Sequence, residues 1–243
     1  MRIPRFYTEQ TLSLGLTLDL NKNIHHHAIQ VLRLKVNENI ILFNGEGGEY
    51  LAKLILADKR KSSVSIVSFN DILRESSLKT NLVLAIIKSD KMDFAIQKAV
   101  EMGVNCIQPI YTNRSVINIK ANRLDKKMLH WQGVINGACE QSGRTIIPKI
   151  QPPISLESWL AKPSSIMRLA MLPGDYPQIS SLSIPSNKEV SLIVGPEGGF
   201  TDQEVELLLS SNITGIQFGP RILRAETAVV AGLSLCQQQW GDL

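Results

Sequence analysis

Short apolar runs alternate with helical patterns after residue 80, and this alternation constrains the fold more than any other feature. The continuous apolar run Leu82–Ile87 is typical of a strand that is covered on both faces. The next helix has Asp90 as its predicted N-cap and Gly103 just past its end. Its predicted buried face consists of Met92, Ala95, Ile96, Ala99 and Val100. Further strands are predicted at 106–111, 166–172, 190–194 and 216–218, and further helices at 123–140, 201–210 and 224–239. The pattern predicts βαβ units and therefore an α/β domain with a mostly parallel sheet.

The first 70 residues have a different pattern. The β-rich segments 40–43, 50–55 and 64–69 are separated by turns, and Asn44–Gly48 is a hairpin signal. One helix is predicted here, with Asn23 as N-cap and His26, Ile29, Leu32 and Arg33 at helical spacing. These features predict a compact β-barrel or sandwich with one helix. The polar stretch 71–80 marks the boundary, so we expect domains at 1–72 and 73–243.

Composition excludes several classes of protein. Of 243 residues, 44% are hydrophobic, enough to bury a core, so general disorder is excluded. No apolar run approaches the roughly 18 residues of a membrane span, and MRIPRFYTEQ lacks the apolar stretch of a secretory signal. The three cysteines are far apart, which excludes a disulfide framework and a CxxC metal site. We therefore expect a cytoplasmic protein without a membrane partner.

Positive charge is concentrated near the N-terminus. Residues 1–70 contain nine Lys and Arg against six Asp and Glu, whereas the remainder contains seventeen against sixteen. A small basic module beside a nearly neutral body suggests attachment to a polyanion such as nucleic acid. An excess of three charges is also ordinary surface chemistry, so charge alone leaves both interpretations open.

The segment Ser191–Glu204, SLIVGPEGGFTDQE, carries the clearest ligand signal. A buried strand stops at Gly195-Pro196, and Thr201-x-x-Glu204 is a capping box that opens a helix. Such a turn presents free backbone N–H groups at the carboxyl edge of a parallel sheet, where ligands of open α/β sheets bind. The segment matches neither GxGxxG nor the P-loop, so a ligand loop and a plain connection both remain open. Gly45-x-Gly47-Gly48 leads into another strand and is interpreted as a hairpin loop.

A second strand-end turn occurs at Phe218–Ala228, FGPRILRAETA. Arg221 and Arg224 flank an apolar pair at the start of the predicted last helix, and Glu226 lies in its first turn. The helix dipole favours the acid there but opposes arginines. The arginines therefore need another reason, such as an anionic ligand or a carboxylate partner.

Three other features have ordinary structural interpretations. Gly143 is a natural residue to follow the helix that ends in ACEQS, and Arg144 beyond it is well placed to cap. Cys139 is a lone cysteine on a helix and is expected to pack rather than react. His25, His26 and His27 lack spaced Cys or acidic partners, so we expect no metal site, one RNA-facing histidine and two surface ones.

Together, several motifs resemble one known family. MRIPRF, HHAIQVLRLK, FNGEGGEY, DKMDFAIQKAVEMGV, the Asn113-Arg114-Ser115 triplet, ACEQSGR, LIVGPEGGF and FGPRILRAETA occur in this order from Met1 to the terminal WGDL. The chain is similar to the bacterial 16S rRNA (uracil-N3)-methyltransferases, a branch of the SPOUT superfamily. Ala225 stands where that family more often has threonine, a small departure.

The resemblance implies a fold and a cofactor. The first domain would be a PUA-like β-barrel that binds RNA, and the second an α/β methyltransferase domain with a C-terminal trefoil knot. Ordinary topology rules would have rejected such a knot. The cofactor would be S-adenosyl-L-methionine, without a metal. Its pocket would be lined by Leu172, Gly195, Pro196, Gly199, Phe218, Gly219, Ile222 and Leu223.

The resemblance also implies a reaction and partners. The enzyme would methylate N3 of one uridine of 16S rRNA, at position 1498 in the usual rRNA numbering, in the small ribosomal subunit. We expect Arg224 or Arg221 to stabilise the negative charge on the base, and Glu226 to act as a base or to orient Arg224. The expected RNA contacts are Arg2, Arg5, His27, Arg33, Arg114 and Arg144. A homodimer is expected, with Val229, Val230, Leu233 and Cys236 of the last helix in its interface.

Two alternatives to this activity remain. The chain could be a non-catalytic RNA-binding assembly factor, or a methyltransferase for another acceptor such as a tRNA ribose. A dinucleotide-dependent oxidoreductase is disfavoured because GxGxxG and its acidic partner are missing.

Overall fold

A computed structural model describes residues 3–115, 117 and 119–243 of the chain. The described residues divide into two compact units, which are treated separately. The barrel unit contains residues 1–75 and 136–147, and the α/β unit contains residues 76–135 and 148–243.

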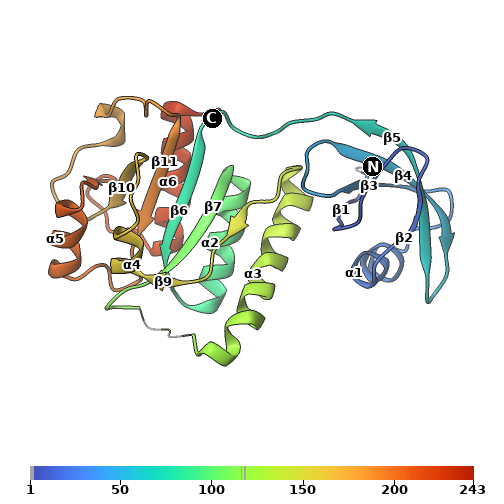
Figure 1. Cartoon of the computed structure of the whole chain (residues 1–243), viewed down its shortest axis with the longest axis horizontal. Coiled ribbons are helices and arrows are strands. Elements are labelled where there is room, and N and C mark those ends of the chain that lie inside the picture. The colour runs from blue at the N-terminus through green and yellow to red at the C-terminus, as the bar shows by residue number, and fades with distance from the viewer. Residues whose placement is uncertain (1–2, 116, 118) are drawn as a thin grey trace. The chain divides into compact units, whose positions relative to one another are not determined.

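The barrel unit is built on a five-stranded sheet (Figure 1). The strands are β1 (Arg5–Tyr7), β2 (Thr17–Asp19), β3 (Asn39–Phe43), β4 (Glu49–Ala57) and β5 (Ser62–Asn70), in the order β1-β3-β4-β5-β2. β3, β4 and β5 form an antiparallel meander, whereas β1 pairs in parallel with β3. The three predicted strands are confirmed, and the turn between the first two has positive φ at all three of its glycines. The three-residue strands β1 and β2 were not predicted, because they are too short to show a period.

The helix of the barrel unit differs from its prediction. Asn21, not Asn23, is the N-cap, because its side chain accepts a hydrogen bond from Ile24 N. The α-helix α1 (Lys22–His25) then widens into a π-helix, η1 (His26–Val31). The wider turn shifts the buried face to Ile24, His25 and Ala28. π-Helical turns are rare and are found frequently at functional sites.

The α/β unit is built on a parallel sheet, as predicted. Its main strands are β6 (Lys79–Ala85), β7 (Val104–Tyr111), β8 (Lys149–Ile150), β10 (Met167–Met171), β11 (Glu189–Val194) and β12 (Thr214–Ile216), in the order β12-β10-β11-β6-β7-β8. Every pairing in this sheet is parallel, including that of the short β9 (Ile154–Ser155) with β7. The carboxyl ends of all these strands therefore lie at one edge.

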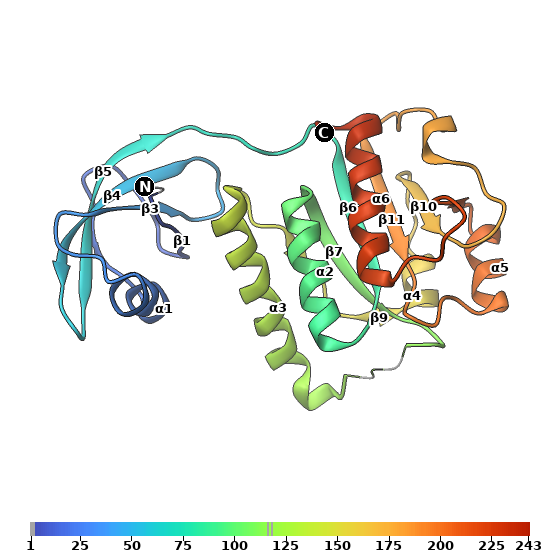
Figure 2. The same ribbon diagram turned by 180° about the vertical axis from the view of Figure 1, so that it is seen from behind.

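Helices cover both faces of this sheet. The helices are α2 (Ser89–Glu101), α3 (Ala121–Ser142), α4 (Leu156–Leu160), α5 (Asp202–Ser210) and α6 (Ala225–Trp240), and η2 (Ile179–Ser181) is a 3₁₀ turn. The part of α3 from residue 136 onward belongs to the barrel unit. α2 and α6 lie side by side on one face (Figure 2). On the other face, Leu156 and Trp159 of α4 and Leu208 of α5 share a core with Val83 and Ile193. Among the described residues, no helix is both long enough and apolar enough to cross a bilayer.

Helix α2 shows which local predictions held. Its five predicted core residues are all buried, and Gly103 has a left-handed φ of 82° past the helix end. Asp90 is not the N-cap, since the helix begins at Ser89 and Lys88 takes that position without a side-chain cap, two residues earlier than predicted. At the end of α3, Gly143 has φ 88° and donates its N–H to Cys139 O, as expected of a C′ residue.

Candidate active site

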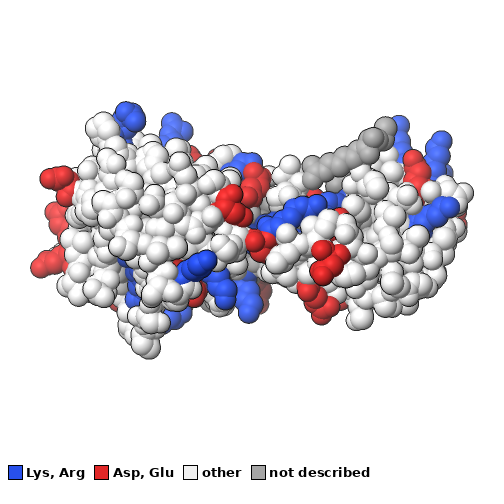
Figure 3. All heavy atoms as spheres, turned by 90° about the horizontal axis from the view of Figure 1, so that it is seen from above, with Lys and Arg blue, Asp and Glu red and all other residues white. Residues whose placement is uncertain are grey.

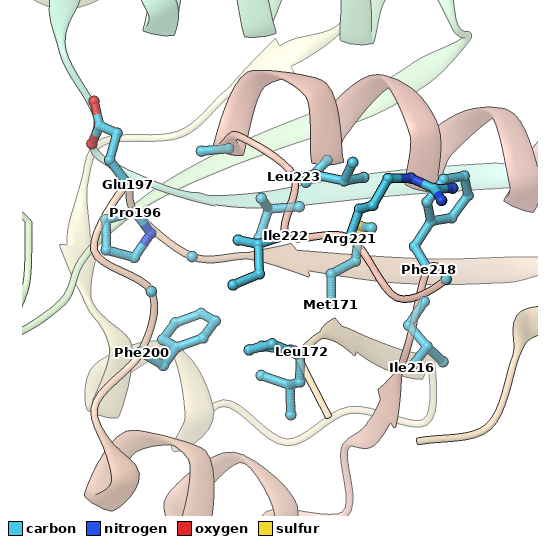
Figure 4. Close-up of a pocket in the computed structure, with 17 residues that line it drawn as sticks. Met171, Leu172, Pro196, Glu197, Phe200, Ile216, Phe218, Arg221, Ile222 and Leu223 are labelled. Carbon is cyan, nitrogen blue, oxygen red and sulfur yellow. The ribbon is translucent and has the colours of Figure 1, made fainter. Parts of the chain in front are cut away.

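A pocket opens at the carboxyl edge of the parallel sheet (Figure 4). It is lined by residues at the ends of three adjacent strands and in the loops that follow them: 171–173 from β10, 194–197, 199 and 200 from β11, and 216, 218, 219 and 221–223 from β12. Ala225 and Ala228 of α6 complete the wall. All eight residues expected to hold the cofactor, and Arg221 as well, line this pocket. The prediction had not included Met171, Glu197 or Phe200, which line it because their strand ends converge there.

The shape and polarity of the pocket fit an organic ligand with a flat or apolar part. Phe200, Leu172 and Ile216 form an apolar wall, and Ile222 reaches into the same space (Figure 4). Ile222 is 89% exposed, so a bound molecule would bury apolar surface that the free protein leaves in water. A Cβ atom on Gly195 would lie 3.0 Å from the Phe200 ring, and Gly199 and Gly219 have φ of 68° and 65°. The glycines therefore both keep the pocket open and permit the turns that shape it.

The loop 195–200 is fixed by contacts on several sides. Glu197 Oε1 accepts a hydrogen bond of 3.1 Å from Lys88 N, and Gly199 N donates to Pro196 O. The predicted capping box is confirmed, because Thr201 and Glu204 exchange side-chain and backbone hydrogen bonds. Arg114 Nη1 donates to Gly198 O at 2.9 Å and to Phe200 O at 3.1 Å. Although Arg114 was expected to contact RNA, part of its guanidinium is engaged inside its own unit.

Two exposed arginines lie beside the pocket at the start of α6. Arg224 is the N-cap residue, and its side chain makes no capping hydrogen bond. Arg221 extends toward the ring of Phe218 (Figure 4). Cations at a helix N-terminus face the unfavourable end of the dipole. This placement is consistent with an anionic ligand.

Glu226 pairs with a residue that the sequence did not suggest. Its Oε1 accepts a hydrogen bond of 2.9 Å from Lys91 Nζ on α2, and both side chains are mostly buried. Burial alone would raise the pKa of Glu226, but the hydrogen bond and charge of Lys91, with the charge of Arg224, hold the pKa below its usual value. Glu226 is therefore ionised at neutral pH, and its hydrogen-bond partner is Lys91 rather than Arg224.

Two of the arginines expected to contact RNA are buried inside the barrel unit. Arg5 forms an ion pair with Glu49 and donates to Arg144 O. Arg144 is 3% exposed and pairs with Glu75, with 3.0 Å between Nε and Oε1. Their charges are satisfied within the protein, so we do not retain them as RNA contacts. Arg2 lies outside the described residues.

The other two expected barrel contacts are exposed. His27 packs edge-on against Phe6, with 5.4 Å between ring centroids, and Arg33 follows the π-helix with a φ of 57°. A positive φ in a non-glycine residue is strained and is concentrated at functional positions. Charges of both signs are scattered among uncharged side chains on the face in Figure 3, so no broad field of one sign covers that face.

Two expectations about reactive side chains are resolved. His25 is buried rather than at the surface, since its ring contacts Ser62 Oγ and Lys59 O. Cys139 is buried, as expected of a packing residue, and burial raises the pKa of its thiol to about 12. Among the described residues, no three His, Cys, Asp or Glu side chains come together as a metal site.

The chain matches two protein-family models. The RNA methyltransferase domain matches residues 74–237, and the RNA methyltransferase PUA domain matches residues 20–67. Both models cover segments whose folds are described above.

Individual relatives are similar over nearly the whole chain. The ribosomal RNA small subunit methyltransferase E of Rickettsia conorii is 36% identical over 96% of this chain and 95% of its own length. The protein of that name from Buchnera aphidicola (Schizaphis graminum) is 32% identical over 100% and 98%. A crystal structure of ribosomal RNA small subunit methyltransferase E from Neisseria gonorrhoeae, bound to S-adenosyl methionine, superposes with a TM-score of 0.92, 37% identity and full coverage of both chains. A putative methyltransferase from Legionella pneumophila in complex with the same cofactor gives 0.96, 36% and full coverage.

Proposed function

The chain belongs to the RNA methyltransferase family of the ribosomal RNA small subunit methyltransferases E, and we propose that it methylates N3 of one uridine in 16S rRNA with S-adenosyl-L-methionine as the methyl donor. The observation that carries this proposal is the pocket at the carboxyl edge. It gathers all eight residues expected to hold the cofactor, in a chain that superposes on two relatives crystallised with that cofactor. Because the proposed substrate is ribosomal RNA, we expect the enzyme in the cytoplasm.

The pocket residues suit the proposed cofactor. Phe200, Leu172 and Ile222 offer apolar surface to the adenine ring of the cofactor. The glycine turns at 195–199 and 219 would bring backbone N–H and C=O groups close to the cofactor's polar atoms. When bound, the cofactor supplies an electrophilic methyl group. The protein must then hold the acceptor nitrogen in line with that methyl group and prevent unproductive orientations of the base.

The acceptor nitrogen requires stabilisation of negative charge. N3 of uracil is an imide nitrogen that must lose its proton before it can attack, and the charge then spreads onto the flanking carbonyl oxygens. We assign this stabilisation to Arg224, with Arg221 as a second donor beside the pocket. Glu226 is ionised and bound to Lys91, so its role is to position Lys91 and to support the charge of Arg224. Because Glu226 is held by Lys91 and its pKa is lowered, we propose that the N3 proton passes to water.

The target base has to leave its stack, because N3 is hidden when uracil is paired. His27 and Arg33, exposed beside the π-helix of the barrel, are the proposed contacts to the flanking RNA. Phosphate contacts by Arg33 would add affinity that weakens with salt. Arg2 stays an expected contact.

We also propose a homodimer and a trefoil knot for the α/β unit. Val229, Leu233 and Cys236 are buried against the chain's own core, so any interface on α6 must use its other face, to which the half-buried Val230 contributes. In support of the knot, the segment after β10 covers β12: Gln217 N donates to Pro177 O, and the Tyr176 ring lies against Gly215. Sedimentation equilibrium would test the dimer. To test the knot, the chain would be pulled between residues 160 and 240, and a knot would make the extended length shorter than the full contour length of that segment.

The decisive experiment is methyl transfer from labelled S-adenosyl-L-methionine to small subunits that lack the modification, with the product nucleoside identified by mass spectrometry. We expect N3-methyluridine at one position. A 2′-O-methyl nucleoside would show that the enzyme methylates ribose instead of the base. If the protein bound RNA but neither bound the cofactor nor transferred a methyl group, a non-catalytic assembly factor would be favoured.

A further inference from the structure

The turn that follows β7 is joined to the pocket loop by side chains that are distant in sequence. Thr112–Ser115 closes on itself through Ser115 N to Thr112 O and through a contact between the Thr112 and Ser115 hydroxyls. From this turn, Arg114 reaches the loop 195–200 after β11, and its Nη1 donates to two carbonyls of that loop.

Glu204 provides a second connection between this turn and the pocket loop. Glu204, in the first turn of α5, is 3% exposed, and its Oε1 accepts a hydrogen bond of 2.7 Å from Asn113 N. Its other oxygen, Oε2, accepts from Thr201 N at 2.8 Å. One carboxylate therefore joins the end of the pocket loop to the turn that carries Arg114.

The Arg114 side chain packs closely against a glycine of the loop. A Cβ atom on Gly198 would lie 3.3 Å from Arg114 Cβ and 3.5 Å from its Cδ, so the arginine stem lies along the bare backbone of Gly198. Gly198 does not line the pocket, whereas its neighbours Glu197 and Gly199 do. Arg114 itself does not line the pocket, and it contacts the loop through the backbone of Gly198 and the carbonyl of Phe200.

We propose that Arg114 is a positioning residue that holds the loop 195–200 in its ligand-binding shape before the ligand arrives. The loop contains three glycines, which lose more backbone entropy on ordering than other residues. A loop already fixed by hydrogen bonds to a charged donor does not incur that cost at binding, so affinity rises without any direct contact. This inference rests on the proposed function only for the identity of the ligand.

The test compares Arg114→Met with wild type and with Arg123→Met, which removes an exposed arginine from the first turn of α3. S-adenosyl-L-homocysteine binding is measured by calorimetry, small-subunit rRNA binding by filter retention, and loop order in the ligand-free protein by amide exchange. For Arg114→Met we expect cofactor-product affinity to fall roughly tenfold. We also expect faster exchange at Gly199, Phe200 and Thr201, and unchanged RNA affinity. Arg114→Lys should recover part of the affinity, and Arg123→Met should bind the product like wild type.

Two outcomes would overturn the inference. If Arg114→Met bound RNA more weakly but kept wild-type product affinity and amide exchange, Arg114 would be an RNA contact. If it unfolded at lower denaturant concentration and the product-affinity loss recurred with an equally destabilising variant far from the loop, the effect would be general. Failure of wild type itself to bind the product would instead count against the proposed function.

Discussion

Lys91 on α2 and Glu226 on α6 form an ion pair across 135 residues of sequence, with 2.9 Å between Nζ and Oε1. The pair joins the two helices that cover one face of the parallel sheet, and it lies in the first turns of both, next to the exposed Arg224. Because this ion pair lowers the pKa of Glu226, its carboxylate is a weaker base than an ordinary glutamate.

The Lys91–Glu226 pair should make stability depend on acid pH. Because the pKa of Glu226 is lower in the folded protein than in the unfolded chain, its contribution is present above pH 4.5 and is lost as pH falls through the folded value. Urea unfolding at pH 7 and near pH 3 should therefore show an acid loss in wild type larger by about 1 kcal/mol than that in Glu226→Gln. An equal loss in both proteins would show that the pair contributes nothing.

Arg224 should be needed for turnover rather than for cofactor binding. Arg224→Ala removes a cation that is proposed to stabilise charge developing on the base, and such donors are worth roughly 10²–10³ in kcat. Single-turnover methylation at saturating RNA measures the loss, and calorimetry with S-adenosyl-L-homocysteine should give wild-type affinity. Wild-type turnover by the variant would remove Arg224 from the mechanism.

The close approach of α6 to the sheet should make Gly232 intolerant of a methyl group. A Cβ atom there would lie 2.6 Å from Leu192 Cδ2 and 2.7 Å from Met171 Sδ. Gly232→Ala is expected to lower the free energy of unfolding by about 1–3 kcal/mol. The matched control is Gly133→Ala on α3, where nothing lies within 4 Å of an added Cβ. It should raise stability by about 0.5–1 kcal/mol through helix propensity, and equal effects at both glycines would refute the packing argument.

Arg144 should matter for stability and not for RNA. Arg144→Met leaves Glu75, which is mostly buried, without its partner, and breaking a buried pair in this way costs about 3–5 kcal/mol. Denaturant unfolding would measure that loss, and RNA binding by the folded fraction should match wild type. A folded, stable variant with weakened RNA binding would reverse the assignment.

Two substitutions of Arg33 distinguish the effect of its charge from the effect of its strained backbone. Its φ of 57° suits glycine, so Arg33→Gly should remove the charge while keeping or slightly raising stability. Arg33→Ala should remove the charge and keep the strain. Both variants should reduce the slope of log affinity against log salt by about 1, as expected for one lost phosphate contact. An unchanged slope would exclude Arg33 from the RNA interface.

Local sequence patterns predicted the elements whose causes are local. The helical face from Met92 to Val100 and the capping box of Thr201 and Glu204 depend on residues a few positions apart, and both are confirmed. The π-helix at 26–31 was missed because its wider turn has no distinct sequence period, and that error displaced the buried face of the helix.

Pairings between remote segments could not be predicted. No pattern in one sequence indicates that Lys91 meets Glu226 or that Arg144 meets Glu75, because each pair is set by how helices and loops pack. The same limit applies to Arg114, whose motif suggested a functional residue but whose carbonyl partners lie more than 80 residues away. The residues of the pocket were implied by the family resemblance, whereas the strand-end turns alone indicated only the edge of the sheet where a ligand could bind.

The pocket also has a consequence for how the protein is made. Its lining residues lie within the segments 171–173, 194–200 and 216–228, and the last of them is Ala228, so no nascent chain has the complete site until residue 228 has left the ribosome. Partly synthesised chains should therefore be unable to sequester the methyl donor, and cofactor binding should report that synthesis has passed this point.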